Sequence, residues 1–150
     1  MALRISNNPI QLSEGIVREY LSALYEQNVQ VSRIWRLGEE KSKAAKDLKG
    51  FGYGVPYVIE FRVNGEERSV VLETMRPEGF GHDHFTDRAQ VLLWQHSSFG
   101  KLPRHVHSID VGAFTNDGKS MKSAGDCGEF FIVTELVEGK LYHFDLDHIK

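Results

Sequence analysis

Residues 50–65 read Gly-Phe-Gly-Tyr-Gly-Val-Pro-Tyr-Val-Ile-Glu-Phe-Arg-Val-Asn-Gly, and they contain the strongest structural signal of the chain. The part at 55–63 is rich in β-branched and aromatic residues and predicts a strand. Asn64-Gly65 is the pair typical of a two-residue type I′ turn, because both central positions of that turn need positive φ. With a second strand predicted at 68–75, the stretch forms a β-hairpin that is entered through glycines.

The glycines at alternate positions, Gly50, Gly52 and Gly54, suggest a loop that approaches a ligand closely. Without Cβ atoms, their backbone N–H groups can surround a phosphate chain. The order strand, glycine loop, strand is used by kinase-type nucleotide sites, whereas a Rossmann site runs from strand into helix. Taken alone, the run also fits a sharply bent or bulged strand.

Hydrophobic periodicity outward from the hairpin predicts an α+β fold. Apolar residues at helical spacing predict an N-terminal helix at 13–27, capped by Ser13, and a second helix at 85–98. A strand is expected at 29–37, with a slip in its alternation near Ile34, and a long lysine-rich connection follows at 38–49. Two further strands are expected at 106–114 and 129–137. We therefore expect one five-stranded antiparallel sheet with one main packed helix and an N-terminal helix.

The length, net charge and apolar content of the chain argue against several classes of function. The chain has 150 residues, 41% of them hydrophobic, and a formal net charge of −3. This size suits one domain or one lobe, and the chain has no basic block of the kind that follows a nucleic-acid backbone. No apolar run is long enough to span a membrane and no signal peptide is recognisable, so we expect a cytoplasmic protein without nucleic-acid or membrane partners. The lone Cys127 has no partner for an internal disulfide.

Two further stretches carry a resemblance to a known family. Residues 80–89, FGHDHFTDRA, are followed by VLLW at 91–94, and residues 130–139 read FFIVTELVEG. Together with the order of elements, they resemble the N-terminal lobe of the protein-kinase-like fold. The residues of these stretches are most similar to those of the aminoglycoside phosphotransferase and choline-kinase-like small-molecule kinases.

The resemblance implies a nucleotide site for ATP and magnesium. Gly50, Gly52 and Gly54 would cover the phosphates, and the backbone of Glu135 and Val137 would face the adenine edge. Asp87 would be the acidic residue of the helix, which in such kinases pairs with a base on the third strand.

The chain departs from this pattern at Glu73, which stands where that base is expected. Two facing carboxylates repel each other and phosphate, unless one is protonated or a metal bridges them. Arg76 could supply a cation only in a different register.

The resemblance also implies a division of the chain. Residues 1–28 would form a helical extension packed on the lobe, 29–139 the lobe itself, and 140–150 the start of a crossing to an absent C-terminal lobe. That lobe would supply the catalytic aspartate and the site for a small-molecule acceptor. We expect no catalysis by this chain alone, and we expect it to self-associate through apolar surface that its partner lobe would cover.

Two other readings remain open. The same fold could serve as a binding or regulatory module without catalysis, which Glu73 favours. Alternatively, an unrelated α+β protein could bind a transition metal through His82, His84 and Asp87, because imidazole and carboxylate suit such ions. A second pair, His105 and His107, would share one strand face, because residues two apart in a strand point the same way.

Overall fold

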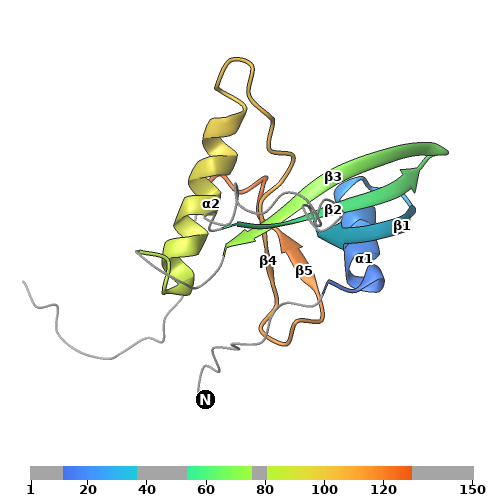
Figure 1. Ribbon diagram of the computed structural model, residues 1–150, viewed down its shortest axis with the longest axis horizontal. Helices are drawn as coiled ribbons and strands as arrows, with labels where there is room; N and C mark the ends of the chain where they lie inside the picture. Colours follow the sequence, from blue (N-terminus) through green and yellow to red (C-terminus); the bar gives the residue numbers. More distant parts are fainter. Residues whose placement is uncertain (1–11, 37–53, 76–80, 130–150) are drawn as a thin grey trace, which may run out of the picture.

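The computed structural model describes residues 12–36, 54–75 and 81–129 (Figure 1). Its elements, in chain order, are α1 (Glu14–Leu24), β1 (Val29–Arg36), β2 (Gly54–Val63), β3 (Glu66–Met75), α2 (Phe85–Phe99), β4 (Gly112–Phe114) and β5 (Met121–Ser123). The α+β class is confirmed, and so are both helices and the first three strands. In the described part of the chain, no helix is both long and apolar enough to cross a membrane.

Strands β1, β2 and β3 form an antiparallel sheet in that order. The turn between β2 and β3 has φ of 53° at Asn64 and 80° at Gly65, as a type I′ turn requires. The register between β1 and β2 shifts between Val31 and Arg33. This irregularity confirms the slip in alternation that the sequence predicts, because an extra residue returns Ile34 to the face of Val29 and Val31.

The core lies between α1 and one face of this sheet. Its buried residues come from the helix and from β1 and β2: Val17, Leu21, Val29, Ile59, Phe61 and Val63. Ser13 caps α1 as predicted, with its Oγ accepting the Ile16 N–H at 3.4 Å. At the other end of the helix, the Ser22 Oγ accepts the Val29 N–H at 3.1 Å, which fixes the start of β1.

The prediction of a single five-stranded sheet is wrong. Strands β4 and β5 form a separate two-stranded antiparallel sheet. The polar residues that follow β4 form a tight turn, which Asp117 closes. Its Oδ1 accepts the Thr115 hydroxyl at 2.6 Å and the Lys119 N–H at 3.1 Å, and both bonds lower the pKa of Asp117. The chain therefore reverses at Gly118, where φ is 69°.

The strand predicted at 106–114 is also shorter than expected. Only Gly112–Phe114 is a strand, and His105 and His107 precede it in irregular structure. The shared strand face predicted for these two histidines is therefore absent. The strand predicted at 129–137 lies outside the described residues, apart from Glu129, which is not in a strand.

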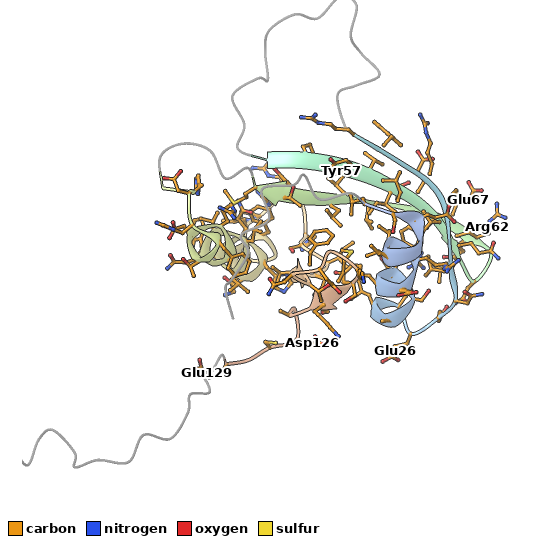
Figure 2. All side chains as sticks on the ribbon, turned by 90° about the horizontal axis from the view of Figure 1, so that it is seen from below. Glu26, Tyr57, Arg62, Glu67, Asp126 and Glu129 are labelled. Carbon is orange, nitrogen blue, oxygen red and sulfur yellow. The ribbon has the colours of Figure 1, made fainter. Side chains whose placement is uncertain are left out.

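Asp110 joins the small sheet to α1. Its Oδ2 accepts the Tyr20 hydroxyl of α1, and its Oδ1 accepts the Ser123 hydroxyl at 2.9 Å and the Gly125 N–H at 3.0 Å. A Cβ at Gly125 would overlap the Asp110 Oδ1, so the close approach needs glycine. Figure 2 shows α1 and the β4–β5 hairpin on the same side of the large sheet. The other face of that sheet points away from both.

Helix α2 stands apart from the core. None of its residues is buried, and Phe85 and Trp94 are among the most exposed large hydrophobic side chains of the described chain. Figure 1 shows α2 beyond the Gly54 end of the sheet rather than against its centre. An apolar helix without a buried face is typical of an element that another surface covers.

Candidate functional site

The open face of the β1–β3 sheet carries a row of apolar side chains. Val58 of β2 lies between Trp35 of β1 and Val71 of β3 in the strand register. Because successive side chains alternate between faces, these three point away from Ile59 and α1. Val71 is 57% exposed, whereas Val70 and Leu72 on either side of it pack against the core.

Trp35 is held in position on this face by polar neighbours. Its indole Nε1–H donates to Glu60 Oε1 at 3.3 Å, and the Arg33 guanidinium carbon lies 5.4 Å from its ring centroid. These contacts with a carboxylate and a cation fix the plane of the ring. Trp35 is thus a preset flat surface beside Val58.

The polarity of the open face changes along the strands. At the hairpin end, Arg62 and Glu67 are cross-strand neighbours with an ion pair of 2.7 Å (Figure 2). The apolar row with Val58 follows, and then the pair Pro56 and Glu73. Strand β2 begins at Gly54, four residues before Val58, or about 13 Å along an extended chain.

The structure places only part of the predicted site. Gly54 is the first residue of β2, opposite Met75 of β3. Gly50, Gly52, Glu135 and Val137 lie outside the described residues. Gly54 thus marks one end of the sheet, and the pair Pro56 and Glu73 lies between it and the apolar row.

Glu73 lies on the open face, two residues beyond Val71, and is exposed. The arginines of this face, Arg33 and Arg62, lie on the hairpin side of the row. The face therefore presents a carboxylate, rather than a cation, at the end nearer Gly54.

Asp87 lies in the first turn of α2, where its Oδ2 accepts the His84 N–H at 3.3 Å. Arg88 supports the same turn by donating to the carbonyl oxygens of His82 and Asp83, at 2.7 and 2.9 Å. A carboxylate in this position satisfies a free N–H and favours the helix dipole. Asp87 thus has a structural role in the cap. Beside it, an open hollow on α2 is lined by Phe85, Ala89 and Leu93.

A transition-metal site does not assemble from His82, His84 and Asp87. Within residues 12–36, 54–75 and 81–129, no three His, Cys, Asp or Glu side chains come close enough to hold a metal ion. His84 occupies the N-cap position of α2. The geometry therefore gives the metal-binding alternative no support.

The remaining histidines with defined contacts tie the end of α2 to the segment before β4. His96 Nδ1 lies 2.8 Å from the Ser108 Oγ, and the His105 ring stacks on Phe99 with centroids 4.5 Å apart. The Ser108 hydroxyl also reaches the Asp110 carbonyl oxygen at 3.3 Å. These contacts order the loop, and no third group aligns the pair His96 and Ser108 for nucleophilic chemistry among the described side chains.

The sequence reading named the glycines but missed the apolar row. The Asn64-Gly65 turn sets the register of β2 and β3, so the pairing of Val58 with Val71 could have been read from it. Trp35 could not be paired with Val58 in the same way, because residues 37–53 rather than a short turn join β1 to β2 and the sequence does not set their register.

Comparisons with known protein families, with curated proteins and with solved structures find no match for this chain.

Proposed function

We propose that the open face of the β1–β3 sheet binds a nucleotide, and that the chain is the nucleotide-binding lobe of an ATP-dependent small-molecule phosphotransferase of the aminoglycoside phosphotransferase type. The observation that carries the proposal is the row of Trp35, Val58 and Val71 across the open face, in which Val71 is 57% exposed and Val58 lies four residues along β2 from Gly54. A flat apolar surface suits a purine ring, and glycine backbone suits phosphates.

The order of elements supports the same assignment. The segment from 37 to 53, with Gly50 and Gly52, connects β1 to β2, so the glycines join two adjacent antiparallel strands. Helix α2, with Asp87 in its first turn, is the next element after β3 in the described part of the chain. This is the arrangement that the resemblance to phosphotransferase N-terminal lobes implies.

Under this proposal the chain supplies nucleotide binding and not the chemical step. Mg-ATP would lie with its base on the apolar row and its phosphates toward Gly54. The proton-accepting aspartate and the acceptor pocket would belong to a C-terminal lobe. The phosphate acceptor is a small molecule whose recognition that lobe would determine.

A second candidate is a binding or regulatory module of the same fold. The observation that favours it is Glu73, an exposed carboxylate on the open face near Gly54. An uncompensated carboxylate weakens phosphate binding by charge repulsion. A gain of ATP affinity in Glu73→Lys would show that this position faces the phosphates, and no change would count against the alignment on which both candidates rest.

The experiment uses Trp35 as a reporter of binding. In a Trp94→Phe background, Trp35 is the remaining tryptophan, and Mg-ATP should change its fluorescence in a saturable manner. Val71→Asp should weaken binding at least tenfold, because it places a charge where the base would lie. Val106→Asp, at a valine of similar exposure far from this face, is the matched control and should bind as the parent does. A saturable response that Val71→Asp leaves unchanged would place the nucleotide elsewhere, and no response would reject nucleotide binding at this face.

A further inference from the structure

The loop after α2 exposes aliphatic side chains at one extremity of the molecule. Figure 1 shows this segment, coloured yellow to gold, projecting past the C-terminal end of α2 and away from the large sheet. Leu102 is 49%, Val106 70% and Ile109 59% exposed. Exposed aliphatic side chains gathered in one short loop are a sign of an interaction surface.

The same region contains cationic residues and no acidic ones. No Asp or Glu occurs from 88 to 109, although the chain contains 21 acidic residues in all. Lys101 and Arg104 are exposed within the loop itself. The loop thus presents two cations beside its aliphatic side chains, with no acidic residue of its own to neutralise them.

Backbone hydrogen bonds tie the start of the loop to the end of α2. The N–H groups of Lys101 and Leu102 donate to the carbonyl oxygens of Ser98 and Phe99, at 2.9 and 3.3 Å. Arg104 has a φ of 55°, a left-handed conformation that is uncommon for a residue with a side chain. A strained residue in an ordered loop indicates a shape that is kept for a purpose.

We propose that the loop at 100–109 docks on an anionic phospholipid surface, with Leu102 and Val106 entering the headgroup region and Lys101 and Arg104 against the lipid phosphates. The cations complement the negative charge of such a surface. A projecting loop can insert shallowly, whereas a protein partner would need a matching groove, and leucine and valine are under-represented among protein hot spots.

This inference revises the expectation of no membrane contact. That expectation rested on the lack of a spanning run, and a surface contact through a loop needs none. It is independent of the proposed nucleotide site, because Trp35, Val58 and Val71 lie on the large sheet and not in this loop.

The test is co-sedimentation of the full chain with vesicles of phosphatidylcholine alone and with 30% phosphatidylserine, a composition of about one anionic lipid in three. We expect binding to the anionic vesicles only, with release at high salt because the attraction is screened. Lys101→Glu/Arg104→Glu should lower binding at least tenfold, and so should Leu102→Ser/Val106→Ser.

The matched control is Arg18→Glu/Lys122→Glu, which makes the same charge change at exposed residues of α1 and β5 and should bind as the parent does. Circular dichroism would establish that each variant is folded. No binding to anionic vesicles, equal binding to both vesicles, or equal loss in the control pair would overturn the proposal. Binding of polyglutamate by the chain in the absence of vesicle binding would assign the loop to an acidic protein partner instead.

Discussion

Glu73 is the residue on which the proposed phosphate contact depends. It is exposed on the open face, on the side of Val71 that leads to Gly54. We expect Glu73→Lys to raise Mg-ATP affinity several-fold, because it replaces a repulsive charge near the phosphates with an attractive one. Titration calorimetry would measure the change. Glu19→Lys, on the exposed side of α1, is the control for net charge, and an equal gain there would mean that Glu73 has no special position.

Tyr20 and Asp110 give a second prediction at the level of single residues. Burial, and then the hydrogen bond to Asp110, raise the pKa of the Tyr20 phenol well above its ordinary value. A raised pKa means that the neutral phenol is favoured in the folded state. The associated stability is present below about pH 10, the usual pKa of tyrosine, and is lost as pH rises through the higher native pKa.

We therefore expect Tyr20→Phe to lower the free energy of unfolding by about 1–3 kcal/mol near neutral pH, because the Asp110 carboxylate loses a donor. The difference from the parent should shrink in strongly alkaline solution, where the parent also loses this bond. Urea unfolding across a pH series would measure both effects. A difference that grows with pH would contradict the assignment of the bond.

At the scale of elements, the hairpin turn offers a matched pair of glycine substitutions. A Cβ at Gly65 or at Gly15 would meet no atom within 4 Å, so neither change creates a clash. Gly65 has a φ of 80°, and we expect Gly65→Ala to destabilise by about 1–2 kcal/mol through backbone strain alone. Gly15→Ala, inside α1, should stabilise by up to about 1 kcal/mol. Thermal unfolding would compare them, and a loss in both would point to packing instead of φ.

The elements that could be predicted are those with a local signal. Ser13, the helical spacing of α1 and the Asn64-Gly65 turn each act through neighbours in sequence, so the helix and the hairpin follow from the chain alone. The small sheet could not be predicted, because its strands are three residues each and depend on the side chain of Asp117 and on the long-range bonds of Asp110. In the candidate site, the pairing of Val58 with Val71 could be predicted from the hairpin turn. The pairing of Trp35 with Val58 could not, because no short turn joins β1 to β2.

At the scale of the whole molecule, α2 carries the prediction of self-association. Phe85 and Trp94 are 67% and 68% exposed on a helix with no buried residue. We expect a concentration-dependent dimer or oligomer, because burial of such side chains releases about 1.5–3 kcal/mol each. Sedimentation velocity over a hundredfold concentration range would detect it. Phe85→Ser/Trp94→Ser should shift the equilibrium toward monomer, and a monomer at every concentration would contradict the prediction.

Binding of nucleotide to the open sheet face would be visible residue by residue in an amide-resolved NMR titration of the chain with Mg-ATP. We expect saturable shifts at Gly54, Val58, Val71 and the Trp35 indole N–H, with little change in α1 or in the loop at 100–109. Shifts confined to other elements, or none at millimolar Mg-ATP, would contradict it.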